Sequence, residues 1–130
     1  MYCLDTNIII DFFRGDKGII NNLTRLSNKG ANFFITYLTL CELYKGAFLH
    51  LKKEEKVIEI DNFASDQFIL DFNINSCRIY GSLYYLLSKS GKMIPEPDIM
   101  IASIVKANNF ILITRDKRHF ENLGIKVEKW

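Results

Sequence analysis

The sequence predicts an α/β fold, a single three-layer domain over residues 1–130 whose central, mostly parallel sheet of about four to five strands is flanked by helices. Three observations support this prediction. Short segments of strand character alternate with longer helical patterns. The strand segments are continuously apolar, as expected for strands covered on both faces. The turns are short, and no linker, repeat or low-complexity tract divides the chain.

The first half of the chain contains two strand-like and four helical segments. Residues 2–4 form a short apolar run that ends at the polar turn Asp5-Thr6-Asn7, and a short helix follows. Asp16 is a favoured residue type for capping the next helix, which ends before Gly30. The other elements expected here are a strand at 33–36 and helices at 39–50 and 52–64.

The second half continues the same alternation. Pro95 and Pro97 interrupt regular helix before Asp98, because proline has no backbone N–H and fixes its own φ. A helix is therefore expected only from residue 99 onward. The elements predicted in this half are a strand at 68–72, a helix from 75 or 76 to about 91, a helix at 99–108 and strands at 110–114 and 125–128.

Composition and cysteine content exclude several classes of protein. Apolar residues make up 48% of the chain, which excludes a disordered protein. The net charge of +2 excludes a globally basic nucleic-acid binder, so any nucleic-acid surface must be local. Cys3, Cys41 and Cys77 lie far apart in apolar stretches, which predicts buried free thiols rather than a zinc site or disulfides.

The sequence predicts a cytoplasmic protein without a membrane segment. The N-terminal residues MYCLDTN have neither the basic nor the apolar region of a signal peptide. No apolar run approaches the roughly 20 residues that a membrane-spanning helix needs.

Four acidic residues stand where the predicted elements begin or end. Asp5 and Asp116 follow predicted strands, and Glu42 and Asp98 lie at predicted helix starts. In a parallel sheet, the ends of strands and the starts of the following helices face the same rim, where ligands bind. We therefore expect these four carboxylates, which are distant in sequence, to converge.

Each acid also has an ordinary structural explanation. Asp5 is a good helix cap, and Asp98 in a first helical turn favours the helix dipole. Glu42 completes a capping-box pattern with Thr39, and Asp116 suits an Asx-turn. One carboxylate can both cap a helix and bind a cation. The four together favour a site over four separate structural roles.

Converging carboxylates predict a divalent cation. Carboxylates a few ångströms apart do not all ionise without cost, so a cation stabilises them. Mg²⁺ or Mn²⁺ suits such an all-oxygen site, where the metal can bind a substrate phosphate and activate water. Thr6, Asn7 and Thr114 are expected to support the ligands by hydrogen bonding. No glycine-rich phosphate loop is present, which disfavours a nucleotide cofactor.

Basic residues cluster near the same predicted rim. They are suited to hold a phosphodiester backbone while the metal acts on one linkage. An ordinary solvated surface explains them equally well. The candidate contacts to RNA are Arg14, Lys45, Arg115, Lys117 and Arg118.

The order and spacing of several motifs resemble the PIN domain, most closely VapC-type toxins. The motifs are LDTN at the start, TLCELYKGA in the middle, PDIMIAS, and ILITRDKRHF followed by GIKVEKW. The resemblance covers nearly the whole chain. One departure is that the turn before the acid of PDIMIAS commonly carries glycine, whereas this chain has Pro95-Glu96-Pro97.

The resemblance implies a PIN-like fold and a Mg²⁺- or Mn²⁺-dependent ribonuclease that cuts single-stranded regions, often in tRNA or rRNA. It implies that Asp5 and Asp98 are the main metal ligands, followed by Glu42 and Asp116, and that Thr114 is the supporting hydroxyl. It further implies a homodimer neutralised by a cognate antitoxin protein.

Two other functions remain open at the level of sequence. A phosphoaspartyl phosphatase or receiver domain would use Asp5 as a nucleophile or metal ligand. The phosphatase pattern requires a second acidic residue two positions after the first, where this chain has Asn7. A catalytically inert PIN-like interaction domain is the second alternative, and the presence of all four acids disfavours it.

Overall fold

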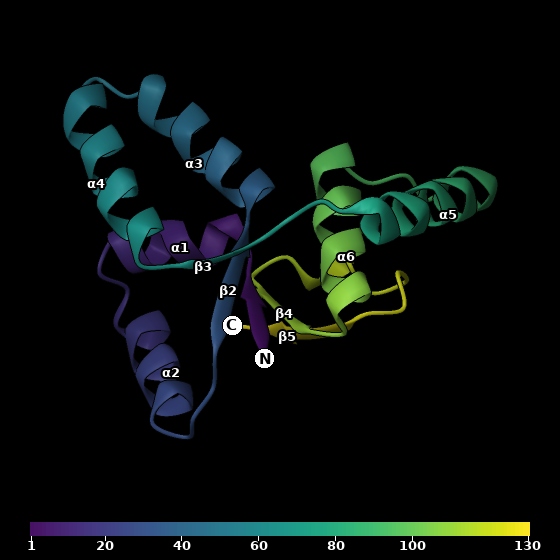
Figure 1. Ribbon diagram of the computed structural model, residues 1–130, viewed down its shortest axis with the longest axis horizontal. Coiled ribbons are helices and arrows are strands. Elements are labelled where there is room, and N and C mark those ends of the chain that lie inside the picture. Colours follow the sequence, from purple (N-terminus) through teal and green to yellow (C-terminus); the bar gives the residue numbers. More distant parts are fainter.

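The computed structural model describes residues 1–130 and has a five-stranded, fully parallel sheet at its centre (Figure 1). Its strand order is β3-β2-β1-β4-β5. The strands are β1 (Tyr2–Leu4), β2 (Phe33–Thr36), β3 (Phe68–Leu70), β4 (Ile111–Thr114) and β5 (Lys126–Lys129). All five predicted strands are confirmed, and β3 is two residues shorter at its end than predicted.

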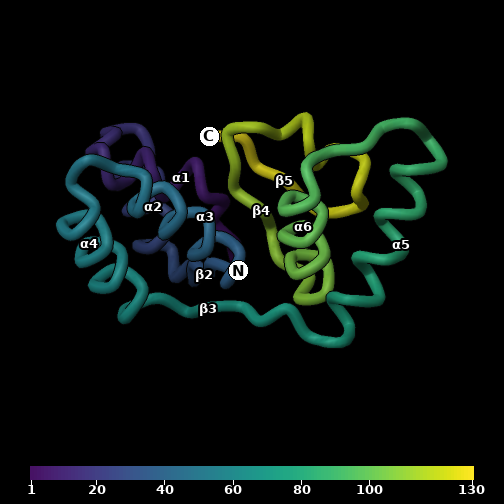
Figure 2. The backbone as a smooth tube through the Cα atoms, turned by 90° about the horizontal axis from the view of Figure 1, so that it is seen from above, coloured from purple at the N-terminus to yellow at the C-terminus, as the bar shows by residue number.

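Helices cover both faces of this sheet (Figure 2). On one side lie α1 (Thr6–Phe13), α2 (Lys17–Ser27), α3 (Tyr37–Phe48) and α4 (Lys53–Ser65). On the other side lie α6 (Glu96–Asn108) and α5 (Ile74–Ser90), with α5 packed against α6. The predicted three-layer α/β architecture is confirmed.

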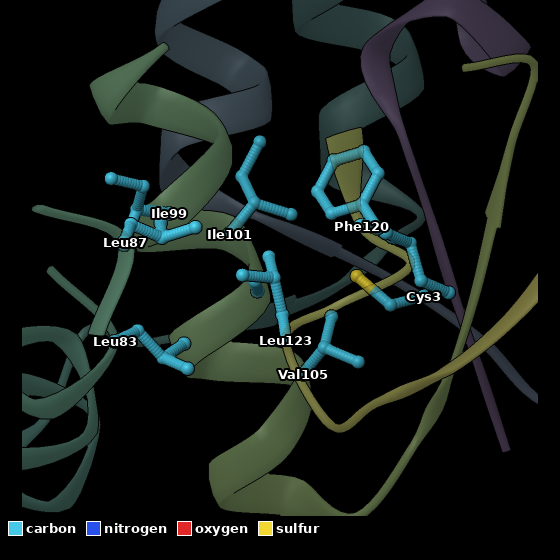
Figure 3. Close-up of a cluster of buried hydrophobic side chains, with 10 residues drawn as sticks. Cys3, Leu83, Leu87, Ile99, Ile101, Val105, Phe120 and Leu123 are labelled. Carbon is cyan, nitrogen blue, oxygen red and sulfur yellow. The ribbon is translucent and has the colours of Figure 1, made fainter. Parts of the chain in front are cut away.

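Each face of the sheet has its own apolar core because successive strand residues point to opposite faces. Cys3 and Leu112 pack with α5 and α6, whereas Leu4 and Ile113 pack with α1 to α4. Figure 3 shows the first of these cores, where Phe120 and side chains of α6 meet Cys3. α6 is buried on most sides, as its nearly continuous apolar sequence predicts.

The starts of two helices that carry site residues differ from the prediction. α3 begins at Tyr37, where Thr36 is the cap and its hydroxyl accepts the Thr39 N–H at 3.0 Å. The predicted capping box of Thr39 and Glu42 is therefore wrong, and Glu42 lies in the second turn of the helix. α6 begins at Glu96 rather than residue 99, with Pro97 in its first turn. Proline is tolerated there because first-turn N–H groups have no partner within the helix.

The cysteines are only partly as predicted. All three are free, but Cys41 and Cys77 are exposed and only Cys3 is buried. Their helices turn these two residues away from the core, which apolar neighbours in the sequence do not reveal. Burial raises the pKa of the Cys3 thiol far above its usual range, so this thiol is inert. No helix combines the length and hydrophobicity needed to cross a bilayer.

The strand order reverses direction at β1. β2 and β3 are added on one side of β1, and the chain then crosses through α5 and α6 to place β4 on the other side. In open parallel sheets, ligands bind at the carboxyl ends of the strands at this switch point. Asp5 directly follows β1 and Thr114 ends β4, so both lie there.

Candidate active site

Asp5 is held by a network of neutral donors between β1 and β4. Its Oδ2 accepts the Thr114 hydroxyl at 2.6 Å and the Asn7 amide at 2.9 Å, and its Oδ1 accepts the Thr6 N–H at 2.8 Å. The Asn7 side-chain oxygen accepts the Arg115 N–H at 3.1 Å, which ties α1 to the end of β4. Asp5 is only 6% exposed, so its carboxylate orientation is fixed.

The other three acids come from separate elements. Glu42 of α3 accepts a hydrogen bond from the Thr6 hydroxyl. Asp98 lies in the first turn of α6, and its N–H donates to Pro95 O at 3.0 Å. Asp116 follows β4 and precedes η1 (Lys117–His119), a short 3₁₀ helix.

All four acids line one cleft of about 390 Å³. Its remaining lining residues are Thr6, Asn7, Ile10, His119 and Phe120. Another hollow of about 340 Å³, between α1, α2 and α4, has no ionisable side chain in its lining and therefore no comparable chemistry. The predicted convergence of the four acids is what the structure displays.

Two of the four carboxyls, those of Asp5 and Asp98, resist ionisation. Burial raises the pKa of Asp5, hydrogen bonds from Thr114 and Thr6 oppose this, and the charges of Asp98 and Glu42 raise it further. Burial also raises the pKa of Asp98, against a hydrogen bond from His119. Excess negative charge in a partly buried cleft favours a bound cation.

The donor set of the cleft fits a hard divalent cation. Carboxylate oxygens from four elements face a shared space, and two of them carry raised pKa values that a cation would reverse. No three acidic, cysteine or histidine side chains already converge closely enough to coordinate one ion. A bound cation would therefore draw the carboxylates together.

Comparison with known proteins identifies the family. The sequence-family model described as the PIN domain matches residues 2–126. The chain belongs to the PIN domain family. It is 32% identical to Ribonuclease VapC2 of Haemophilus influenzae, covering 99% of this chain and 97% of the relative. It is 28% identical to the tRNA(fMet)-specific endonuclease VapC of Shigella flexneri over 99% and 97% of the two chains.

Solved structures agree with this assignment. The structure of VapBC2 from Rickettsia felis, bound to a DNA fragment from its promoter, contains a chain that matches with a TM-score of 0.91. The two chains are 31% identical, and the match covers 99% of this PIN domain and 98% of the other chain. The fold expected from the resemblance is thereby confirmed.

The proline-containing turn before Asp98 is held by the start of α6 and by a contact with α5. Pro95 is the cap of α6, and Glu96 accepts a hydrogen bond from the Tyr80 hydroxyl of α5. That bond and partial desolvation raise the pKa of Tyr80 to about 12. The proline-containing turn is therefore tied to α5 just before Asp98, although none of its residues lines the cleft.

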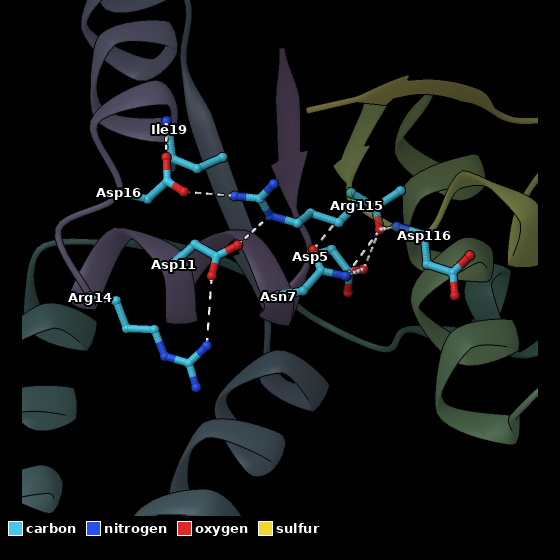
Figure 4. Close-up of polar contacts among 9 residues, drawn as sticks. Asp5, Asn7, Asp11, Arg14, Asp16, Ile19, Arg115 and Asp116 are labelled. Atoms are coloured by element: carbon cyan, nitrogen blue, oxygen red, sulfur yellow. Dashed lines mark hydrogen bonds and ion pairs between the residues drawn. The ribbon is translucent and has the colours of Figure 1, made fainter.

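The basic residues predicted to contact RNA have different surroundings in this PIN domain. Arg115 is not free, because its guanidinium pairs with Asp11 and, at 2.9 Å, with Asp16, pointing away from Asp116 (Figure 4). Arg14 lies 3.8 Å from Asp11 and, like Lys45, is solvent-exposed. Lys117 and Arg118 line a polar hollow of about 540 Å³ that shares Asp116 with the acid cleft.

Sequence reasoning missed two residues of this PIN domain. His119 lies with Nδ1 2.7 Å from Asp98 Oδ2. It was passed over because no nucleophile stands at a telling spacing from it in the sequence. Lys129 at the end of β5 joins the polar hollow beside Asp116. Lys129 depends on strand pairing, since β5 pairs with β4 and carries its last residues to the same rim, whereas His119 depends on how η1 packs against α6.

Without metal, the raised pKa of Asp5 should weaken the PIN domain as pH rises. Between the unfolded and folded pKa values, the folded state binds more protons, so unfolding free energy falls with increasing pH. We expect wild type to lose more stability between pH 4 and pH 7 than Asp5→Asn does. Urea unfolding in chelator at both values measures the difference, and equal losses would contradict it.

Proposed function

We propose that this PIN domain is a divalent-metal-dependent endoribonuclease that cuts single-stranded or loop RNA, as the toxin of a toxin–antitoxin pair. One observation carries the proposal: four acids from four separate segments line a single cleft at the switch point of the sheet. Relatives at about 30% identity over nearly the full chain bear the names ribonuclease and endonuclease VapC, which supports it.

Asp5 and Asp98 would be the principal ligands of Mg²⁺ or Mn²⁺, because burial raises the pKa of both carboxyls and a bound cation would favour their ionised forms. Glu42 and Asp116 are the further candidates. When bound, the cation would polarise a phosphate and lower the pKa of a water molecule.

The protein's own groups would fix this arrangement. Thr114 and Asn7 orient Asp5, while the Thr6 hydroxyl holds Glu42 across from it. Glu42 is half-buried and the Asp116 side chain is 37% exposed, so either could orient the attacking water or accept its proton. Positioning would then come from α1 and β4, and charge from all four acids.

The substrate strand would leave the cleft over the polar hollow beside Asp116. Lys117, Arg118 and Lys129 line it, whereas Glu121 is its only acid apart from Asp116. Backbone phosphates of a single strand fit such a surface without sequence recognition. We propose a structured RNA with an accessible loop, such as tRNA or rRNA, as the substrate class.

Removing a lysine of this hollow should weaken RNA binding in a salt-dependent way. The plot of log affinity against log salt has a negative slope. For Lys117→Ala or Lys129→Ala, we expect this slope to become shallower by about 0.7 for each phosphate that the side chain neutralises in wild type. Lys29→Ala removes the same charge from an exposed position just after α2 and should leave the slope unchanged. Titrations of a catalytically inactive protein with a single-stranded RNA measure both slopes.

The toxin role implies an antitoxin protein as partner. The R. felis relative was solved as VapBC2, which supports a partner protein for this chain as well. We further propose a homodimer that acts in the cytoplasm. Ultracentrifugation of the purified chain, alone and with the protein encoded beside it, tests these two assemblies.

The decisive experiment measures cleavage by the purified chain against metal. We expect Mg²⁺ or Mn²⁺ to support internal cuts in loop-containing RNA and chelator to stop them. The same cations should raise the melting temperature, because a ligand that binds only the folded state stabilises it. An inert interaction domain would show neither effect at millimolar metal. Labelling of Asp5 by acetyl phosphate would instead support a phosphoaspartyl enzyme.

A further inference from the structure

The acids in the cleft fall into two pairs with different partners. Asp5 and Glu42 accept hydrogen bonds from neutral hydroxyl and amide groups. Asp98 and Asp116 instead share one imidazole: Nδ1 of His119 lies 2.7 Å from Asp98 Oδ2, and Nε2 lies 3.4 Å from Asp116 Oδ2. His119 thus links a carboxylate of α6 to one that follows β4.

The two contacts of His119 differ in strength. An ionised carboxylate can only accept hydrogen bonds, so Nδ1–H of His119 donates a hydrogen bond to Asp98. The distance of 2.7 Å is that of a charge-assisted hydrogen bond, whereas 3.4 Å to Asp116 exceeds the normal range. His119 therefore tethers Asp98 and holds Asp116 only weakly, as does Arg118, whose Nε lies 3.8 Å from Asp116 Oδ1.

Both partners of the tether rest on rigid elements. Phe120, the next residue, is 1% exposed and packs in the core between α6 and the sheet. Its N–H donates to Lys117 O at 3.0 Å, which closes η1. The backbone of His119 cannot move far without lifting Phe120 out of this core. Asp98 is equally fixed, in the first turn of a buried helix.

We propose, on the basis of the proposed function, that His119 is a positioning residue for the metal site. Its Nδ1–H holds one oxygen of Asp98, so the carboxylate presents its remaining lone pairs to a divalent cation in a fixed orientation. Hydrogen-bonded partners of metal ligands typically contribute 10- to 100-fold in metal affinity. His119 is not a catalytic residue in this proposal, because it acts through Asp98.

Mn²⁺ binding without RNA tests the proposal, using electron paramagnetic resonance at one fixed pH. We expect His119→Ala to weaken binding by at least about tenfold. His119→Asn should bind nearly as well as wild type, because its amide N–H can replace Nδ1–H. His50→Ala removes the only other histidine, which is exposed just after α3, and should bind like wild type. Metal-free melting temperatures should stay close together, since His119 does not fill the core.

The possible outcomes distinguish a failure of this proposal from a failure of the proposed function on which it rests. Unchanged or tighter Mn²⁺ binding by His119→Ala, while wild type binds, overturns the positioning role alone. Equal weakening in the alanine and asparagine variants also overturns it, because the hydrogen bond would then not be the cause. Failure of wild type to bind any divalent cation or to cut RNA overturns the proposed function as well.

Discussion

Asp98→Ala is expected to abolish RNA cleavage while the chain stays folded. Loss of a principal ligand should slow cleavage by roughly 10³-fold or more, because metal stabilisation of phosphoryl charge is worth several kcal/mol and about 1.4 kcal/mol is a factor of ten. Asp98 is only partly buried and its removal leaves no buried polar atom unpaired, since His119 is solvent-accessible. Single-turnover cleavage and circular dichroism measure the two effects.

A matched substitution keeps this result interpretable. Asp71→Ala removes an exposed acid just after β3, outside the cleft, and should cut RNA at the wild-type rate. Asp98→Ala should still bind single-stranded RNA, because the polar hollow of Lys117, Arg118 and Lys129 is unchanged. Cleavage by Asp98→Ala at a rate within a few-fold of wild type would show that Asp98 is not a principal metal ligand.

Phe120→Ala should cause the largest loss of stability among single substitutions near the cleft. The ring is 1% exposed, and truncating a buried phenylalanine costs about 3–5 kcal/mol in unfolding free energy. Total stability of a domain is about 5–15 kcal/mol, so the variant should be marginal. It should also bind metal more weakly, because η1 would no longer hold His119 against Asp98.

Urea unfolding in chelator measures this loss against a surface control. Phe48→Ala removes the same side chain from a position that is 64% exposed at the end of α3. Its effect should stay within about 0.5 kcal/mol. A loss below about 1 kcal/mol for Phe120→Ala would show that the Phe120 ring contributes little to the core.

The sequence was most informative where one local pattern had a single structural solution. Continuous apolar strands separated by amphipathic or buried helices require a parallel sheet covered on both faces, and this sheet is observed. It was least informative where two solutions compete. Thr36 and Thr39 are three residues apart and both can cap a helix; the end of β2 at Thr36 decides between them.

The candidate site was predictable to the same extent. Acids at strand ends converge because the topology of a parallel sheet requires it, so Asp5, Glu42, Asp98 and Asp116 could be found. The hydrogen-bonded and ion-paired partners of individual side chains could not be predicted from the sequence. The pairing of Arg115 with Asp11 and Asp16, and of His119 with Asp98, depends on how α1, the start of α2 and η1 pack rather than on any spacing along the chain.

The reversal of strand order at β1 also bears on when the protein becomes dangerous to the cell that makes it. Asp5 emerges early from the ribosome, but Thr114, Asp116 and His119 emerge only with β4 and η1. β4 pairs with β1, so a nascent chain that stops before β4 lacks two of the five strands and three of the nine residues that line the cleft, Asp116, His119 and Phe120. We expect unfinished chains to be harmless, which leaves time for a neutralising partner to be synthesised.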